Sequence, residues 1–343
     1  MLDGKRVLVT GGTGSLGKAL VRRLLTSELG QPDRVVVFSR DEAKQHEMRM
    51  EWLNRRVATD EVIYRDHLNM LEFQIGDVRD YDAISAAVRS ADVVFHAAAL
   101  KQVPSCEYAP MEAVKTNIVG ASNLARAILA PSSHVELAVA ISTDKACKPV
   151  NVMGMTKALQ ERVFINANLG QTRTRFLCVR YGNVISSRGS VIPLFLEQID
   201  RGGPVTVTLD RMTRFLLTLD SAVDTIFAAA RAGRAGDTYI PRLPSAYVLD
   251  IARALIGDRN IPIKIVGPRP GEKVDEIMIS EEEILRTVER DGYYVIRPIL
   301  PELAGDELPP PARTTEYSSR EATLDISDLR DLLESSRDGP PDY

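Results

Sequence analysis

The chain has 343 residues, 44% of them hydrophobic, which is enough to bury a large core and to build two lobes. Its formal net charge of -4 gives no general attraction for nucleic acid or for an anionic membrane, so we expect neither as a partner. Cys106, Cys147 and Cys178 are far apart and odd in number, which argues against a disulfide framework and favours a reducing cytoplasm. We expect no signal peptide, no membrane span and no metal site, because the sequence offers no apolar run or paired Cys/His spacing of the required kind.

Apolar, β-branched runs alternate with helical patterns through the first half of the chain. Strands are expected at 6–10, 34–38, 71–78, 92–99, 135–143 and 175–184. After the first of them, Ala19, Leu20, Leu24 and Leu25 recur at helical spacing. This order predicts an α/β fold: a Rossmann-like, doubly wound parallel sheet covered by helices on both faces.

The alternation fades after Asn183 into shorter elements that contain more Pro and Gly. We expect a Rossmann domain over 1–185, with elements returning from the second half, and a smaller substrate-binding lobe over 186–300. A Pro-stiffened C-terminal arm over 301–343 should end in a short helix beginning near Ser327.

A Gly-rich turn, "TGGTGSLG", separates the first expected strand from the first helix. Glycines at 11, 14 and 17 let backbone N–H groups approach a pyrophosphate at the helix N-terminus, where the helix dipole favours negative charge. Their context at the start of a wound sheet favours dinucleotide binding over a merely tight turn.

The end of the second expected strand should decide which dinucleotide binds. Ser39, Arg40 and Lys44 there can hold a 2′-phosphate, which favours NADP over NAD. The alternative is that Arg40 is an ordinary surface residue and that Asp41 binds the ribose. Asp77 follows the third strand, where its carboxylate could accept from the adenine amino group, cap a helix, or do both.

The stretch "STDKACKPVNVMGMTK" follows the fifth expected strand, whose carboxyl end should face the ligand crevice. Thr143, Asp144 and Lys145 lie at that end, and Lys157 follows on the next helix. Their position favours a catalytic cluster over a solvated surface pair. Met153 precedes Lys157 by four residues, where related hydride-transfer enzymes usually carry Tyr, and its thioether cannot exchange a proton. We expect Met153 to pack beside the ligand.

Almost end to end, the sequence resembles the extended short-chain dehydrogenase/reductases, and within them the UDP-N-acetylglucosamine 4,6-dehydratases of polysaccharide biosynthesis. The motifs that carry the resemblance are "TGGTGSLG", "FSRDEAKQHEMR", "GDVRD", "FHAAALKQVPSCEYAPMEAVKTNIVGASNL", "STDKACKPVNVMGMTKALQE", "RYGNVISSRGSVIPLF", "MTRF" and "RPGEK". The stretch from "ALKQVPSCE" to "KTNIVG" is most similar to the soluble, capsule-type branch that inverts C5, and that branch also carries Met in place of Tyr.

The resemblance implies a reaction in which hydride passes from C4 of the sugar to NADP, the C5 proton and the C6 hydroxyl leave, and hydride returns to C6. It assigns Lys145 as the C5 base and Asp144 as the acid for the C6 hydroxyl, a division of roles that suits a lysine and a carboxylic acid. We expect Lys157 to hold the nicotinamide ribose and to depress the pKa of Lys145. Thr143, Asp144 through water, and Lys145 all stay open as the group that removes the C4 hydroxyl proton.

The resemblance extends to residues that should contact the ligands. For the cofactor they are Gly11, Thr13, Gly14, Ser15, Leu16, Gly17, Ser39, Arg40, Lys44, Asp77, Val78, Ala97, Ala98, Ala99, Lys101, Lys157, Tyr181 and Asn183. For UDP-N-acetylglucosamine they are Lys101, Asn183, Arg188, Ser190, Val191, Arg214, Arg269 and Glu272. A guanidinium pairs well with a pyrophosphate oxygen, whereas a surface or interlobe salt bridge is the alternative for each of these arginines.

Three other functions stay open: a 4,6-dehydratase that retains C5, a sugar-nucleotide C4 epimerase, and an inactive NADP-binding scaffold. Such epimerases normally use the Tyr that is missing here. The resemblance also suggests a homo-oligomer, with a hexamer as the expected assembly and the C-terminal arm packed on neighbouring subunits. The segment before the third strand, "RVATDEVIYRDHLNM", is longer than is typical of this branch and should alter an edge or an oligomer contact.

Overall fold

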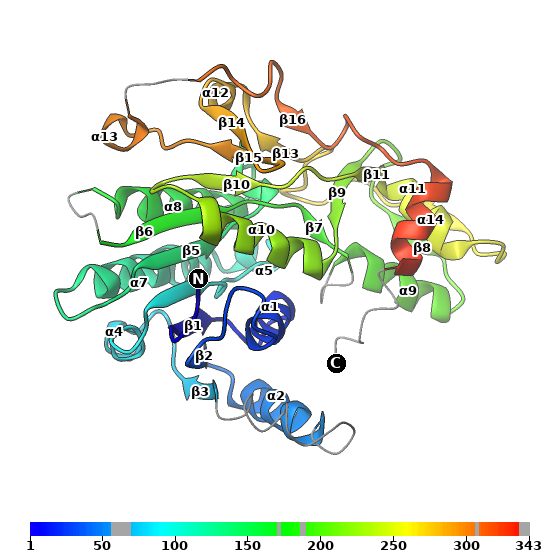
Figure 1. The fold of residues 1–343 in the computed structure, drawn as a ribbon. Helices are drawn as coiled ribbons and strands as arrows, with labels where there is room; N and C mark the ends of the chain where they lie inside the picture. The colour runs from blue at the N-terminus through cyan, green and yellow to red at the C-terminus, as the bar shows by residue number, and fades with distance from the viewer. Residues whose placement is uncertain (56–69, 170–172, 186–189, 306–308, 336–343) are drawn as a thin grey trace.

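The computed structural model describes residues 1–55, 70–169, 173–185, 190–305 and 309–335 (Figure 1). A nine-stranded sheet forms its centre, in the order β14-β15-β10-β6-β5-β4-β1-β2-β3. The strands are β1 (Arg6–Thr10), β2 (Arg34–Ser39), β3 (Leu71–Ile75), β4 (Val93–His96), β5 (Leu137–Ile141), β6 (Arg175–Val179), β10 (Thr238–Ile240), β14 (Thr287–Arg290) and β15 (Tyr293–Ile296). All pairings from β3 through β10 are parallel, and β15 and β14 complete the edge antiparallel. The predicted Rossmann-like α/β fold is confirmed.

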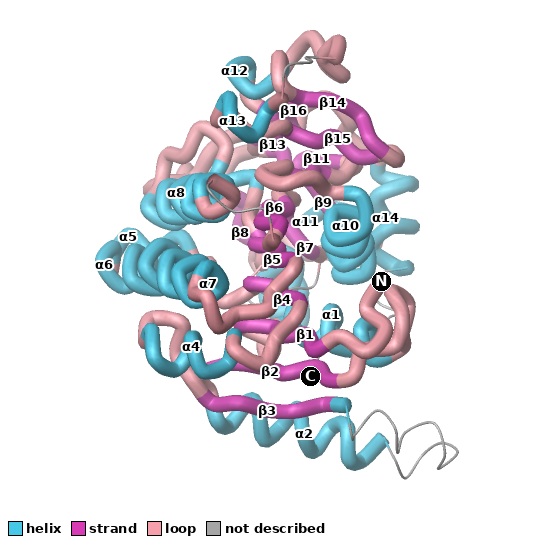
Figure 2. Tube along the Cα trace, turned by 60° about the vertical axis from the view of Figure 1, so that its left-hand side comes forward, coloured by secondary structure: helices cyan, strands magenta, loops and turns pink. Residues whose placement is uncertain are grey.

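Helices cover both faces of this sheet, as Figure 2 shows. One face carries α1 (Ser15–Leu25), α2 (Glu42–Arg55) and α10 (Leu219–Ala232); the other carries α4 (Tyr81–Val88), α7 (Gly120–Leu129) and α8 (Val152–Asn166). Successive residues of a strand pack into hydrophobic cores on opposite faces of the sheet. Val7 and Val9 of β1 lie in the core with α1 and α10, whereas Leu8 lies in the core with α4 and α7. This alternation explains the continuous apolar runs, because both faces of every central strand are buried.

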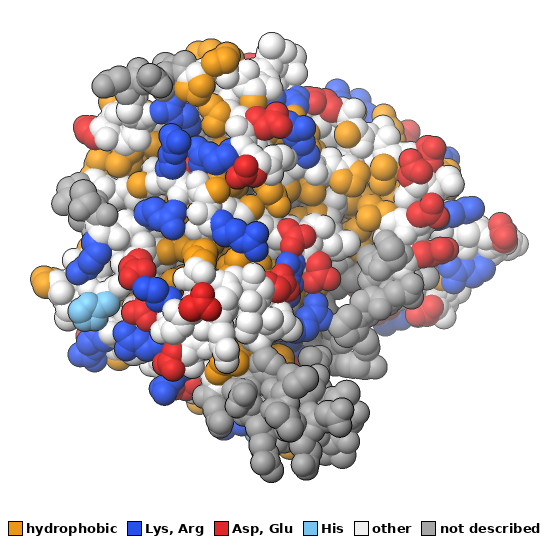
Figure 3. Space-filling view, in the orientation of Figure 1, with side chains coloured by type: hydrophobic (Ala, Val, Ile, Leu, Met, Phe, Trp, Pro, Cys, Tyr) orange, Lys and Arg blue, Asp and Glu red, His pale blue; other side chains and the backbone are white. Residues whose placement is uncertain are grey.

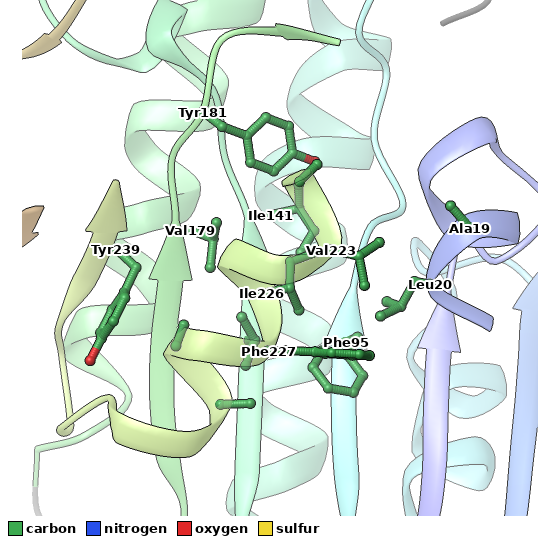
Figure 4. Packing of buried hydrophobic residues seen from close by; sticks show 14 of the residues in the cluster. Ala19, Leu20, Phe95, Ile141, Val179, Tyr181, Val223, Ile226, Phe227 and Tyr239 are labelled. Carbon is green, nitrogen blue, oxygen red and sulfur yellow. The ribbon is translucent and has the colours of Figure 1, made fainter. Parts of the chain in front are cut away.

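The core beneath α10 is drawn in Figure 4. Val223, Ile226 and Phe227 of α10 point toward the sheet and pack in one buried cluster with Phe95 of β4 and with Leu20 of α1. The apolar stripes of two helices from distant parts of the sequence therefore share one strand surface.

The expected sixth strand over 175–184 is wrong as a single strand. β6 ends at Val179, and β7 (Asn183–Val184) pairs instead with β9 (Thr213–Leu217) in a separate sheet that also contains β11 (Ser245–Tyr247). A Cβ added to Gly182 would lie 2.5 Å from Cβ of Phe215, so glycine is needed where the chain crosses from one sheet to the other. β3, β4 and β5 are also shorter than predicted, because the residues after each of them leave the sheet as loops.

The second half of the chain builds a further lobe beside the sheet's carboxyl edge. Its core joins α9 (Val191–Asp200), α11 (Val248–Ile256), α14 (Ile326–Ser335), β8 (Val205–Val207) and β12 (Ile263–Ile265). β13 (Ile277–Ile279) pairs with β16 (Tyr317–Ser318), and the start of α14 confirms the helix predicted near Ser327. The remaining elements are α5 (Val103–Tyr108), α6 (Pro110–Ala113), a π-helix (Val114–Val119), a 3-10 helix (Asp144–Ala146), α12 (Glu281–Ile284) and α13 (Pro301–Ala304).

Positive and negative side chains are interspersed over the face drawn in Figure 3, as expected from the small net charge. Among the described residues, no helix combines the length and apolar character needed to cross a bilayer. Over the same ranges, no group of three or more His, Cys, Asp or Glu side chains is placed to hold a metal ion. The long segment before β3, 56–70, lies outside the described residues except for Met70.

Candidate active site

A cleft of about 1050 Å³ opens at the carboxyl ends of the parallel strands, the place where ligands bind in open α/β sheets. The sequence-predicted residues that line it are Gly11, Thr13, Gly14, Ser15, Leu16, Gly17, Ser39, Arg40, Lys44, Asp77, Val78, Ala97, Ala98, Ala99, Lys101, Thr143, Lys145, Met153, Lys157, Tyr181, Asn183, Ser190, Val191, Arg214, Arg269 and Glu272. Asp144 lies behind this surface, fully buried, and Arg188 lies outside the described residues. The fold thus brings together residues from both halves of the sequence.

The Gly-rich turn packs against the end of β4. Gly11 has φ +70°, and a Cβ there would lie 2.6 Å from the backbone nitrogen of Ala98. A Cβ on Gly17 would lie 2.4 Å from the carbonyl oxygen of Gly11. α1 begins directly after this turn, and Gly14 at its N-cap supplies no side-chain bond, so the first N–H groups of the helix remain available to an anion. This cradle fits the pyrophosphate of a dinucleotide.

The cations after β2 are paired with nearby carboxylates. Lys44 Nζ lies 2.8 Å from an oxygen of Asp41, and Arg40 Nη1 lies 3.8 Å from Oδ2 of Asp77. Arg40 remains 55% exposed, so its guanidinium has room to turn toward a ligand. The Ser39 hydroxyl accepts from Gln45 Nε2 at 3.0 Å and can still donate.

Asp77 does not cap a helix, so that part of the prediction is wrong. Asp80 is the N-cap of α4 and accepts from the backbone nitrogens of Asp82 and Ala83. Asp77 instead accepts from the backbone nitrogen and guanidinium of Arg79. Burial alone would raise the pKa of Asp77, but the hydrogen bonds from Arg79 outweigh it and lower the pKa.

The chain leaves β5 through Ser142 and enters the 3-10 helix that carries Asp144 and Lys145. Oδ1 of Asp144 accepts from Thr143 Oγ1 at 2.9 Å and from Lys145 Nζ at 3.1 Å. The same Nζ also donates to Asn183 Oδ1 at 3.1 Å. Thr143, Asp144 and Lys145 are thus one hydrogen-bonded group, with Thr143 and Lys145 on the cleft and Asp144 behind them.

A second carboxylate, Glu276, faces the same amine and was not expected from any motif. Its Oε1 lies 3.1 Å from Lys145 Nζ, and its side chain is 2% exposed. Burial raises the pKa of Asp144, and the charge of Glu276 raises it further against the opposing effect of Lys145. Burial would lower the pKa of Lys145, but the two carboxylates outweigh it and the pKa is raised.

Lys157 does not depress the pKa of Lys145, contrary to the expectation. Its amine is buried and donates to the carbonyl oxygen of Ile141 and to Gln160 Oε1. Burial lowers the pKa of Lys157 itself to about 8. The lowered pKa that was expected for Lys145 is therefore found at Lys157, because Asp144 and Glu276 flank only Lys145.

Met153 is buried and packs with Cys106 and Ala113, next to Leu100 and Val103. It also lines the cleft. This is the packing position predicted for an aprotic residue at the usual Tyr site.

Two residues missed by sequence reasoning fix the turn of Lys145 against α8. A Cβ on Gly154 would lie 2.2 Å from the carbonyl oxygen of Lys145, so α8 and the turn touch backbone to backbone. Asn151 is the N-cap of α8: its Oδ1 accepts from Gly154 N, and its Nδ2 donates to the carbonyl of Gly271 at 2.7 Å. An Asn before a helical pattern is a capping signal that could have been noticed.

A buried charge cluster lies beneath the site. Arg180 forms ion pairs with Glu161 of α8 at 2.7 Å and with Glu283 of α12 at 2.9 Å. Ser142 Oγ donates to Glu161, which ties the end of β5 into the same network. Burial would raise the pKa of Glu283, but Arg180 outweighs it and lowers the pKa to about 2.

Several residues that were predicted to contact the substrate lie in the C-terminal lobe and line the cleft. Arg214 is buried, and its guanidinium donates to the carbonyl oxygens of Thr213, Lys273 and Val274. Arg269 is exposed, and its backbone nitrogen donates to Glu272 Oε2 at 3.4 Å. Ser190 has a buried hydroxyl without a hydrogen-bond partner among the described residues. Lys101 lies at the cleft after β4, and burial lowers its pKa.

The sheet order and the glycine cradle are those expected of a dinucleotide-binding α/β protein, and the second lobe completes a polar cleft. The chain belongs to the polysaccharide biosynthesis protein family, whose model matches residues 7–298. It is 43% identical over 303 residues to a UDP-N-acetylglucosamine 4,6-dehydratase (inverting) of Campylobacter jejuni, covering 87% of this chain and 84% of that protein. It is 42% identical over 302 residues to a UDP-glucose 4-epimerase of Rickettsia akari, covering 86% and 84%. The X-ray structure of Pen from Bacillus thuringiensis superposes with a TM-score of 0.86 at 34% identity, covering 98% of this chain and 99% of Pen.

Proposed function

We propose that this protein is a UDP-N-acetylglucosamine 4,6-dehydratase that inverts C5 and forms a UDP-2-acetamido-2,6-dideoxy-4-keto-hexose for polysaccharide or glycan biosynthesis. The observation that carries the proposal is the hydrogen-bonded group of Thr143, Asp144 and Lys145 at the carboxyl end of β5, beside a cleft that the Gly-rich turn also lines. The inverting dehydratase among the relatives supports it.

The cofactor that fits the cradle is a nicotinamide dinucleotide, and we propose NADP. Ser39 and the half-exposed Arg40 support a 2′-phosphate site, as does Lys44. When bound, the nicotinamide supplies the group that takes hydride from C4 and returns it to C6. Lys157 is assigned to the nicotinamide ribose, and burial lowers its pKa to about 8.

The chain's own residues handle the protons. Lys145, as the neutral amine, takes the C5 proton made acidic by the 4-ketone and becomes an ammonium, and Asp144, in its protonated form, gives a proton to the leaving C6 hydroxyl. The raised pKa of Asp144 favours the protonated form that an acid requires. Because Asp144 lies behind the cleft surface, Thr143, which donates to its Oδ1, is the side chain between that acid and the ligand. Arg214, Arg269 and Glu272 are assigned to the UDP moiety.

The test is to incubate the protein with UDP-N-acetylglucosamine and NADP in heavy water and to follow the products by NMR. A 4-keto product should form, with solvent deuterium at C5 of inverted configuration and no solvent label at C6. Lys145→Ala should lose product formation by roughly two to four orders of magnitude while still binding both ligands. A Lys145→Ala enzyme that turns over at the wild-type rate would exclude Lys145 as the base.

The same assay decides between the alternatives. An original C5 configuration would replace the inverting assignment by a retaining one. A C4 epimer without a 4-keto product or C5 label would favour the epimerase function, which the name of the Rickettsia akari relative supports. The buried Met153 at the usual Tyr position argues against that reading, since it supplies no exchangeable proton.

A homo-oligomer, with a hexamer as the expected assembly, and a cytoplasmic location are further parts of this proposal. Tyr108 and Met111, on α5 and α6, are 92% and 60% exposed, and two large apolar residues exposed so close together support a protein contact at this place. The free thiols of Cys106, Cys147 and Cys178 are buried, and unpaired cysteines support a cytoplasmic location. Light scattering of the purified protein would give the subunit number.

A further inference from the structure

Glu276 is a buried carboxylate at the reaction centre that belongs to none of the motifs described above. It precedes β13, lines the cleft, and has only 1% of its surface exposed. Its Oε1 contacts Lys145, and its buried Oε2 has no hydrogen-bond partner among the described residues. Burying a carboxylate is costly unless charges compensate it, so its position calls for an explanation.

The charges around Glu276 come from three elements. Lys145 Nζ lies 3.1 Å away, Arg214 Nε of β9 lies 3.9 Å away, and Lys273 Nζ also lies 3.9 Å away. The two outer cations are occupied elsewhere: Arg214 donates to backbone carbonyls, and Lys273 donates to the carbonyl of Cys147. The shortest ion pair of Glu276 is therefore the one with Lys145.

The amine of Lys145 has one acceptor for each of its three donors. An ammonium group has three donors and no acceptor, and Nζ has Asp144, Asn183 and Glu276 each at 3.1 Å. Glu276, and Asp144 when it is ionised, face it with negative charge, Asn183 is neutral, and Arg214 opposes them with its positive charge. The two carboxylates thus stabilise the protonated amine: they make the neutral amine a stronger base, but they also raise the pH at which it becomes neutral.

We propose that Glu276 is a positioning residue for Lys145: its buried carboxylate fixes the amine beside the cleft. The inference rests on the proposed role of Lys145 as the C5 base. Glu276 itself transfers no proton in this scheme. It stabilises the ammonium that forms when Lys145 takes the C5 proton.

Removing the negative charge of Glu276 should lower the pKa of Lys145. Glu276→Gln keeps the shape and one acceptor oxygen but removes the negative charge, so the pKa of Lys145 should fall. The neutral amine would then be available at lower pH. The ascending limb of kcat/KM against pH should move to lower pH by about one unit or more, the usual effect of an opposite charge within hydrogen-bond distance.

The pKa is measured directly by NMR of protein labelled with 13C at lysine Cε, with Lys145→Met to assign the resonance. In the wild type this resonance should titrate at a pH above that of an ordinary lysine, because the carboxylates raise the pKa of Lys145. In Glu276→Gln it should begin to titrate at lower pH. This readout needs no turnover, so it decides the role of Glu276 even if the wild type forms no 4-keto product and the proposed function fails.

Asp275→Asn is the matched control. Asp275 is the neighbouring carboxylate, but it pairs with Arg320 and accepts from Thr213 Oγ1 at 2.7 Å, so its loss should leave the Lys145 titration unchanged. Glu276→Asp retains the charge at a longer distance and should give an intermediate midpoint. If Glu276→Gln does not fold, the titration of Lys145 in Glu276→Asp is the test. An unchanged Lys145 titration in a folded Glu276 variant would overturn the proposal.

Discussion

Gly154→Ala should damage the active site through a contact that involves no side chain of the wild-type protein. The new Cβ would lie 2.2 Å from the carbonyl oxygen of Lys145, whereas ordinary van der Waals contact begins at 3.4 Å, so α8 and the Lys145 turn must separate by about 1 Å. A further contact, 3.2 Å to Asn151 Oδ1, restricts how α8 can yield, because Asn151 holds the Gly271 loop.

The expected cost has two parts. Overpacking of this kind destabilises a protein by about 1–3 kcal/mol. A displacement of about 1 Å at a catalytic group can lower turnover by about 100-fold. We therefore expect a lower kcat for 4-keto product formation, together with a lower melting temperature measured by circular dichroism.

Asn166→Ala is the control, because Asn166 is exposed near the far end of α8. It should leave kcat unchanged. A Gly154→Ala protein with wild-type kcat and melting temperature would refute the reasoning, since it would mean that the turn can move away from α8 without consequence.

Three further predictions concern the cofactor, the aprotic position and the buried ion pairs. Arg40→Ala should weaken NADP binding much more than NAD binding, by ~1.5 to 3 kcal/mol, in fluorescence titrations; equal losses for both would contradict the 2′-phosphate site. Met153→Leu should keep substantial activity if Met153 only packs, and a collapse like that of Lys145→Ala in a folded protein would reveal a role for the sulfur. Arg180→Met should cost about 3–5 kcal/mol in urea unfolding, because Glu161 and Glu283 would stay buried without their cation. The pKa of Glu283 in the folded protein is about 2, below its ordinary 4.5. Its contribution to the free energy of unfolding is therefore fully present above pH 4.5 and is lost as the pH falls from 4.5 toward 2. Over this pH range the free energy of unfolding should fall more steeply for the wild type than for Arg180→Met.

The sequence predicted the elements whose signals are local. The glycines at 11, 14 and 17, the alternating apolar runs and the polar end of β5 each depend on a short stretch of chain, and the structure places them as expected. The chemistry at the end of β5 could be located because parallel strands bring their carboxyl ends to one edge.

The contacts that were missed join segments far apart in sequence. Glu276 reaches Lys145 only because β13 lies beside the 3-10 turn, and an isolated Glu before an apolar run has no distinctive pattern. The break between β6 and β7 was missed because residues 175–184 are apolar enough to read as one strand. The pKa of Lys145 was predicted in the wrong direction because Asp144, together with Glu276, which is distant in sequence, outweighs the burial that would lower it.

The sheet order also has a consequence for how the protein is made. β6 gains its outer neighbour only when β10 pairs with it, and that edge is closed in turn by β15 and β14. While a ribosome is still synthesising the chain, the first six strands therefore present an open, apolar edge until residues 238–296 have emerged. A nascent chain that stops near residue 185 would leave this edge free to pair with other strands, and we expect such fragments to bind chaperones or aggregate instead of folding as a separate cofactor-binding unit.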